Sequence, residues 1–185
     1  MSERVSEAEF LQQQSVPVYN LALRLVGNAA DAEDLAQDAL LRAIKALPAF
    51  RGDSALSTWV YRITVNTWKN RVRSEKRRGL WKMLPLSIFS GGDEEEDGRV
   101  DESSLKADEP ALDAGLESDE RGQAVQKALL ELDEDSRAIV VLREIHGQSY
   151  QEIASALEIP EGTVKSRLSR ARDALKARLQ KLVTP

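Results

Sequence analysis

The sequence feature that most constrains the fold is a long acidic segment in the middle of the chain. Residues 83–120 contain thirteen acidic and two basic residues, a Ser-Gly-Gly turn signal and little periodicity. A segment of this composition cannot bury enough apolar surface to offset the entropy lost on ordering. We therefore expect a flexible acidic linker over residues 80–118, which divides the 185 residues into two domains, 1–79 and 119–185.

Both flanking domains show the three- and four-residue apolar spacing of amphipathic helices. In the first domain we expect two helices over residues 18–47, broken at Gly27-Asn28, with Asp31 as the cap of the second and Pro48 as its stop. A third helix is expected over 56–79. No strand alternation is visible, so the sequence predicts an all-α fold of two small helical domains. The apolar positions of the second domain include Val125, Leu129, Ile139, Leu142, Ile153, Ala154, Leu157, Val164, Leu168, Ala171 and Leu175.

Composition excludes several kinds of chemistry. The chain has no cysteine and one histidine, His146, which excludes disulfides and thiolate metal sites. No apolar run reaches the ~18 residues of a membrane span, so we expect no membrane insertion and a cytoplasmic protein. The sequence also lacks a phosphate-binding loop and a Cys/His pair. We therefore expect neither a cofactor nor an enzymatic activity.

The net charge of −5 hides two compact basic segments. Residues 62–82 contain eight basic residues and one acidic residue, and residues 161–185 contain seven basic and two acidic residues. A surface that binds phosphates needs a positive local potential rather than a positive net charge. The chain is therefore a candidate nucleic-acid-binding protein.

The second basic segment has the pattern of a helix-turn-helix. Ser149 and Glu152 form a capping box that opens a short helix ending near Glu158, and a turn over 159–162 precedes a helix that begins at Thr163. This last helix combines an apolar stripe with a polar face whose residue types reach base edges and phosphates in a major groove. A helical hairpin with a solvated basic face is the alternative. The polar face carries Lys165, Ser166, Ser169 and Arg170.

The third helix of the first domain interleaves aromatic and basic residues. This combination suits unstacked bases and a phosphate backbone. Trp59, however, suits a place in the hydrophobic core better than a contact with DNA. Tyr61 and Trp68 suit packing inside the protein as well as a contact with DNA. The polar and aromatic residues concerned are Tyr61, Arg62, Asn66, Trp68, Lys69, Asn70, Arg71 and Arg73.

Three motifs together resemble the extracytoplasmic-function (ECF) sigma factors of bacterial RNA polymerase. Region 2 of that family is similar to residues 50–66, Phe-Arg-Gly-Asp-Ser-Ala-Leu-Ser-Thr-Trp-Val-Tyr-Arg-Ile-Thr-Val-Asn, and the basic helix that follows. The core-binding helix resembles residues 31–39, Asp-Ala-Glu-Asp-Leu-Ala-Gln-Asp-Ala. The region 4 recognition helix resembles residues 162–172, Gly-Thr-Val-Lys-Ser-Arg-Leu-Ser-Arg-Ala-Arg.

The resemblance implies a transcription initiation factor that binds core RNA polymerase through the clamp coiled coil and the flap. It would read a minus-35 element as duplex and a minus-10 element as a melted strand, with an anti-sigma factor as its regulator. Core binding would involve Asp34, Gln37, Asp38, Leu41 and Arg42. The minus-35 residues would be Lys165, Ser166, Arg167, Ser169 and Arg170, and the minus-10 residues Phe50, Ser54, Tyr61, Arg62, Asn66, Lys69, Asn70 and Arg73.

Two other functional interpretations remain open from the residues alone. The chain could be a stand-alone helix-turn-helix regulator that binds duplex DNA without polymerase, or a helical adaptor without DNA affinity. The linker is either a solvated spacer or, on the resemblance, a polyanion that imitates RNA phosphates inside the polymerase. Lysine at 165 lacks the bidentate fork of arginine, so the promoter sequence is left open.

Overall fold

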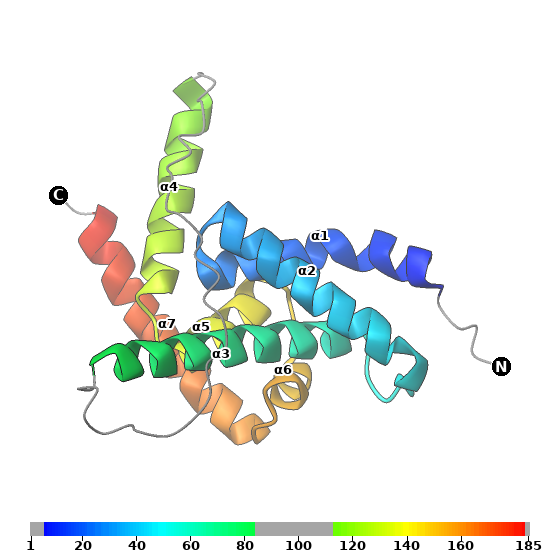
Figure 1. Ribbon diagram of the computed structural model, residues 1–185. Helices are drawn as coiled ribbons and strands as arrows, with labels where there is room; N and C mark the ends of the chain where they lie inside the picture. The colour runs from blue at the N-terminus through cyan, green and yellow to red at the C-terminus, as the bar shows by residue number, and fades with distance from the viewer. Residues whose placement is uncertain (1–5, 84–112, 184–185) are drawn as a thin grey trace.

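The structure is a computed structural model that describes residues 6–83 and 113–183. The acidic run Asp93 to Asp97 of the expected linker lies outside the described residues. The first unit comprises α1 (Glu7–Val26), α2 (Ala29–Ala46), the short turn η1 (Leu47–Ala49) and α3 (Leu56–Met83). The second comprises α4 (Asp113–Leu130), α5 (Glu134–Val140), the π-helical turn η3 (Val141–Ile145), α6 (Tyr150–Leu157) and α7 (Glu161–Val183) (Figure 1). The described residues contain helices and no strand, which confirms the all-α prediction.

The first helix begins earlier than the apolar pattern predicts. Ser6 caps α1 through a capping box, in which its hydroxyl oxygen accepts from the Glu9 amide at 3.2 Å and its own amide donates to the Glu9 carboxylate at 3.0 Å. The apolar spacing predicts this helix only from Val18 onward, whereas the Ser-x-x-Glu signature at residue 6 sets its true start. Gly27 ends α1 with a φ of 90°, a conformation that favours glycine.

The cap of α2 differs from the expected one by three residues. Asn28, rather than Asp31, is the N-cap, and its side-chain oxygen accepts from the Asp31 amide at 2.9 Å. The helix ends before Pro48, as predicted. Its small buried alanines let α1 and α2 approach closely. Core residues of this pair include Phe10, Leu21, Leu25, Ala32, Leu35, Ala39 and Ala43.

Helix α3 runs through the middle of the molecule and is covered on more than one side. It contacts α1 and α2 as well as α6 of the second unit (Figure 1). Accordingly, Val60 and Val65 are fully buried, while Thr58, Tyr61 and Trp68 are also nearly inaccessible. Gly79 does not end the helix, contrary to the prediction, since α3 continues to Met83.

The second unit contains the predicted helix-turn-helix. The capping box at Ser149 is confirmed, with the Glu152 amide donating to the serine hydroxyl at 3.2 Å and Glu152 accepting from the Ser149 amide at 2.7 Å. Helix α6 ends at Leu157, and its C-cap Glu158, with a φ of 56°, turns the chain toward α7. Helix α7 begins at Glu161, two residues before the expected Thr163.

The two units pack against each other. Arg137 of α5 donates to the carbonyl oxygen of Leu25, at the end of α1, at 2.6 Å. The hydroxyl of Thr58 on α3 donates to side-chain oxygens of Gln148 at 2.9 Å and Glu152 at 3.1 Å. Buried apolar side chains of both units accordingly form one hydrophobic cluster. None of the helices in the described part of the chain is long and apolar enough to cross a membrane.

Candidate nucleic-acid interface

The polar face of α7 is accessible over its first three turns. Val164, Leu168 and Ala171 are buried toward the body of the second unit. The opposite side is open because no described helix covers it, and its polar side chains alternate with the buried ones at helical spacing. The exposed residues on that side are Lys165, Ser166, Ser169 and Arg170.

Contacts within α7 orient the two cations of this face. The Lys165 ammonium lies 2.8 Å from the Glu161 carboxylate and 5.6 Å from the centroid of the Tyr150 ring. The hydrogen bond from Lys165 to Glu161 raises the pKa of Lys165 above its ordinary value. Arg170 donates to the Ser166 carbonyl oxygen at 3.3 Å and otherwise projects into solvent. The face therefore presents charged donors at physiological pH.

Arg167 points away from this face, unlike its four predicted companions. Its guanidinium lies 2.6 Å from the carboxylate of Asp135, which belongs to α5. Asp135 in turn accepts from the ammonium of Lys69 on α3 at 2.5 Å. That hydrogen bond lowers the pKa of Asp135, so the carboxylate is charged at neutral pH. One carboxylate thus joins a predicted minus-35 residue to a predicted minus-10 residue.

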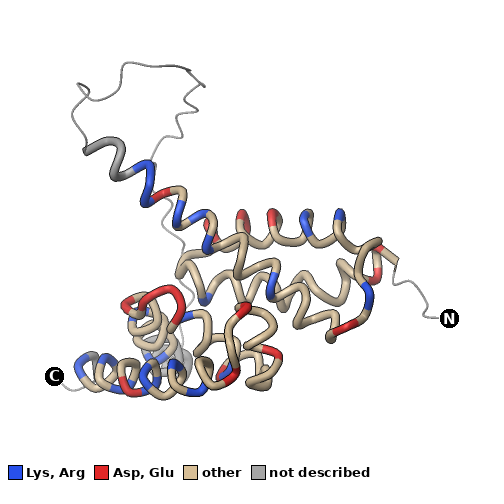
Figure 2. Tube along the Cα trace, turned by 90° about the horizontal axis from the view of Figure 1, so that it is seen from below, with Lys and Arg blue, Asp and Glu red and all other residues tan. Residues whose placement is uncertain are grey.

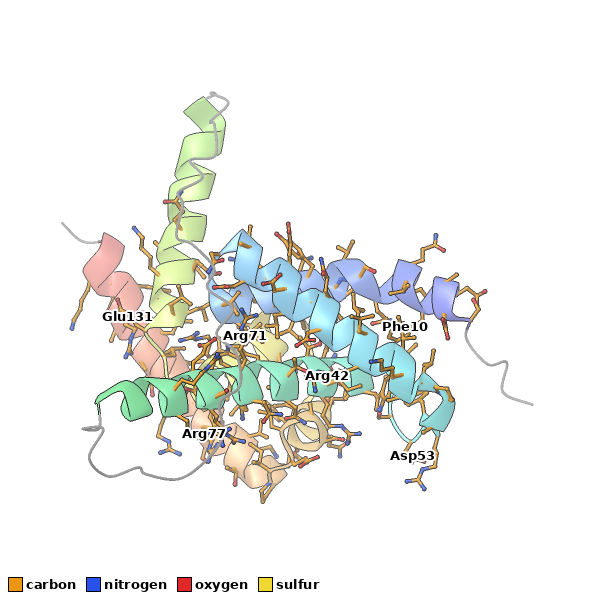
Figure 3. All side chains as sticks on the ribbon, in the orientation of Figure 1. Phe10, Arg42, Asp53, Arg71, Arg77 and Glu131 are labelled. Atoms are coloured by element: carbon orange, nitrogen blue, oxygen red, sulfur yellow. The ribbon has the colours of Figure 1, made fainter. Side chains whose placement is uncertain are left out.

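The exposed part of the α3 set lies toward the end of the helix. Asn70 and Arg73 line a shallow basic cleft together with Lys76 and Arg77. Figure 2 shows basic residues along this stretch, and Figure 3 labels Arg77 there. Lys76 and Arg77 were not among the predicted site residues, although the run Lys76-Arg77-Arg78 in the sequence signals them. Asn66 is also exposed, while Arg62 is half-buried.

Tyr61 is not available as a DNA contact in this arrangement. Its side chain is 7% exposed and packs edge-on against His146, with the ring centroids 4.8 Å apart. The Tyr61 hydroxyl also lies 3.2 Å from Nδ1 of His146. Burial raises the pKa of Tyr61 and lowers the pKa of His146. Both rings therefore stay neutral at physiological pH.

The loop before α3 positions one aromatic ring. Phe50 and Trp59 lie with ring centroids 5.0 Å apart at an angle of 43°, and both Phe50 and Ser54 are half-buried. Asn66 is seven residues beyond Trp59, which corresponds to about 10 Å along the helix axis. The predicted base pocket would therefore have to span the first turns of α3.

The predicted polymerase-binding residues form one exposed stripe on α2. Leu41 is 57% exposed, which is unusual for a leucine on a helix whose other side is buried. Arg42 lies 3.8 Å from Asp38, one turn away, and Figure 3 shows it on this helix. An exposed leucine among polar side chains fits a docking surface. The residues on the stripe are Asp34, Gln37, Asp38, Leu41 and Arg42.

Comparison with known proteins gives two family matches. Residues 12–78 match the family model described as Sigma-70 region 2, and residues 122–175 match that of Sigma-70, region 4. The chain is 37% identical to the RNA polymerase sigma-H factor of Pseudomonas aeruginosa, over 90% of this chain and 82% of that protein. It is 38% identical to the ECF RNA polymerase sigma-E factor of Escherichia coli, over 84% of this chain and 77% of that protein.

Solved structures agree with this assignment. The sigma factor RpoE from Bartonella quintana, in complex with the anti-sigma factor NepR, aligns with a TM-score of 0.66 and 27% identity, over 96% of this chain and 98% of that chain. CnrH in complex with the cytosolic domain of CnrY shares the fold, with a TM-score of 0.62 and 23% identity, over 97% of this chain and 91% of that chain. The chain therefore belongs to the ECF sigma factors of the sigma-70 family.

Proposed function

We propose that this sigma factor directs core RNA polymerase to promoters through three separate surfaces. The exposed stripe of α2 binds the clamp coiled coil, α7 reads the minus-35 duplex, and α3 with its preceding loop binds the melted minus-10 strand. The observation that carries the proposal is the presence in one chain of both the exposed α2 stripe, with its bare Leu41, and the exposed polar face of α7. A stand-alone regulator would need the second surface and not the first.

We also infer the surroundings in which the protein acts. The domain limits we propose are 1–79 for region 2 and 119–185 for region 4, with the acidic linker between them. The second unit would contact the polymerase flap, and an anti-sigma factor would compete for these surfaces, an inference supported by the similarity to RpoE, which forms a complex with NepR. The protein would work in the cytoplasm at the nucleoid and would supply recognition rather than catalysis.

The polymerase assignment is tested by run-off transcription with core polymerase and the purified chain. Promoter-dependent transcripts are expected only when both are present. In an α2 variant, Leu41→Ala should weaken core binding because it removes the apolar centre of the stripe. Two results would support the stand-alone regulator instead: tight promoter binding by the chain alone, or a Leu41→Ala variant that no longer binds core polymerase and yet regulates as well as the parent chain.

The α7 assignment predicts a loss of duplex specificity on removing one cation. Arg170→Ala should cost about 1–3 kcal/mol at the cognate minus-35 sequence, because a base- or phosphate-contacting arginine is lost, and should spare core binding. Lys176→Ala is the matched control, since Lys176 is an exposed cation on the same helix beyond the polar face. Promoter selectivity that is the same in both variants would contradict the assignment.

The minus-10 assignment predicts a defect that depends on the state of the DNA. Asn66→Ala should weaken open-complex formation on duplex promoters and be partly rescued on pre-melted templates, because an opened bubble removes the cost of unstacking and unpairing. Open complexes are counted by permanganate reactivity of unpaired thymines. An equal loss on both templates would indicate a folding defect rather than a role in strand capture.

A further inference from the structure

The contact between the two units covers surfaces that the proposed function needs. Tyr61 packs against His146, and Lys69 donates a hydrogen bond to Asp135. Arg167 points away from the polar face of α7 and donates to the same carboxylate. The two promoter elements lie about 25 base pairs apart by their names, or about 85 Å at about 3.4 Å per base pair. A compact chain of this length has a radius of gyration of about 16 Å. The packed arrangement is therefore too small to occupy both elements at once.

Asp135 lies between a cation of the first unit and a cation of the second unit. Its Oδ1 accepts from Lys69 of the first unit at 2.5 Å, and its Oδ2 accepts from Arg167 of α7 at 2.6 Å. Each carboxylate oxygen thus holds one cation from a different DNA-binding surface. Two oxygens of a backbone phosphate make the same charge-assisted bonds with lysine and arginine.

The surroundings strengthen the bond on the α3 side more than the bond on the α7 side. The Lys69 side chain is 15% exposed, the Arg167 side chain 34% and Asp135 42%. Partly buried charges are screened less by salt than exposed ones. The adjacent Glu134 also pairs with Lys76 of α3, which adds a second carboxylate on the same basic helix.

We propose that Asp135 is an internal phosphate mimic that couples the two promoter-reading surfaces of the free chain. This inference rests on the proposed function, since it takes Lys69 and Arg167 as phosphate-binding residues. A DNA phosphate that captures Lys69 takes from Asp135 its partner on the first unit and so removes this link between the units. The coupling is reciprocal, because the closed contact lowers the affinity of Lys69 for phosphate by the same factor by which bound phosphate disfavours the closed contact.

The separation of the units can be measured without DNA. The chain has no cysteine, so cysteines placed at the exposed positions Glu33 of α2 and Ala177 of α7 accept a pair of fluorescent dyes specifically. Asp135→Asn keeps the shape of the side chain and removes its charge. We expect this variant to show lower energy transfer at low salt, approaching the value that the parent chain reaches only at high salt.

A matched control separates bridging from a mere change of net charge. Glu144 pairs with Arg172 of α7 at 2.6 Å, so this ion pair lies inside the second unit. Glu144→Gln therefore removes one negative charge and frees one α7 arginine without cutting the link that Asp135 makes between the units. Its energy transfer should equal that of the parent chain. Lys69→Met must give the same opening as Asp135→Asn, which guards against a local folding defect in α5.

The competition with phosphate is tested with short random-sequence duplex DNA and the free chain. Fluorescence anisotropy should show that Asp135→Asn binds about threefold to tenfold more tightly at low salt, with a difference that shrinks as salt rises. Glu144→Gln should give a clearly smaller gain. If Asp135→Asn and Glu144→Gln share the same energy transfer and the same DNA affinity, the phosphate-mimic proposal is wrong.

Run-off transcription keeps this outcome distinct from the proposed function. Asp135→Asn should remain active with core polymerase, because the carboxylate is not needed once the units have parted. A parent chain that gives no promoter-dependent transcript overturns the proposed function, whatever the dyes report. An active parent chain together with an Asp135→Asn variant that stays closed overturns the phosphate-mimic proposal alone.

Discussion

Arg137 is the side chain whose removal should most weaken the contact between the two units. Its guanidinium donates to the Leu25 carbonyl oxygen at 2.6 Å, which lies at the end of α1. It also donates to three carbonyl oxygens at the end of α4 and just beyond it, and lies 5.5 Å from the centroid of the Trp68 ring. One planar group therefore caps the carboxyl ends of two helices from different units. The α4-side acceptors are Leu129 at 3.0 Å, Leu130 at 2.6 Å and Leu132 at 3.1 Å.

The size of the effect follows from these contacts. A hydrogen bond to a charged group contributes about 1.5–3 kcal/mol when its acceptor cannot be solvated after truncation. The carbonyl oxygen of Leu130 is exposed and binds water once the guanidinium is removed. Its hydrogen bond therefore adds little to the expected loss of stability. A cation over an aromatic face adds about 0.5–1 kcal/mol. Arg137→Ala should therefore lower the free energy of unfolding by about 2–4 kcal/mol in total.

Urea unfolding followed by tryptophan fluorescence and circular dichroism measures this loss. Arg137→Lys should lose about half as much, because lysine keeps the charge and cannot reach several acceptors with one planar fork. Arg42→Ala is the control, since Arg42 is an exposed arginine with a surface ion pair one turn away. If Arg137→Ala lies within about 0.5 kcal/mol of this control, the capping role assigned to Arg137 is refuted.

Two further predictions concern the same contact. Because burial lowers the pKa of His146, the unfolded chain binds a proton at this histidine more readily than the folded chain does. The free energy of unfolding should therefore fall as the pH drops below the ordinary pKa of 6.5. Urea titrations between neutral and mildly acidic pH measure this dependence, and His146→Gln should flatten it. At Gly27, with a φ of 90°, an added Cβ would lie 2.5 Å from a methyl carbon of Leu130, so Gly27→Ala should lower the melting temperature at a cost of about 1–3 kcal/mol. Gly122→Ala, inside α4 with open space around it, should instead stabilise by about 0.5–1 kcal/mol, and a Gly27→Ala protein as stable as the parent would contradict the close approach.

The sequence predicted those features that depend on residues close together along the chain. The capping box at Ser149 and the exposed polar face of α7 follow from spacing alone, because a serine and a glutamate three residues apart satisfy each other's backbone donors. The exposed stripe of α2 follows in the same way from the apolar positions opposite to it. The error at the start of α2 has an equally local cause, since Asn28 and Asp31 are both good caps and the asparagine precedes the helix.

The packing of the two units could not be predicted in this way. The Lys69–Asp135 pair joins residues 66 positions apart, and Tyr61 meets His146 across 85 positions, so no spacing rule relates them. The acidic composition of the linker indicates nothing about which surfaces of the two units it joins will contact each other. One signal was present: Tyr61 and Trp68 lie outside a single apolar stripe, and a helix with aromatic residues on two sides is one that packs on two sides.

The chemistry of the contact explains how the same residues of α3 can serve both packing and DNA binding. Thr58 meets Gln148 and Glu152 through hydrogen bonds, Lys69 meets a carboxylate, and the aromatic ring of Trp68 lies under a guanidinium. Groups of this kind are solvated when the units part, whereas the apolar side chains that both units contribute to the shared hydrophobic cluster are left to find other cover. Replacing water or a carboxylate by a DNA phosphate then costs little, because the donors are already arranged for an anion. The polar part of the contact is thus the part that α3 can make in the free chain and exchange for nucleic acid on the polymerase.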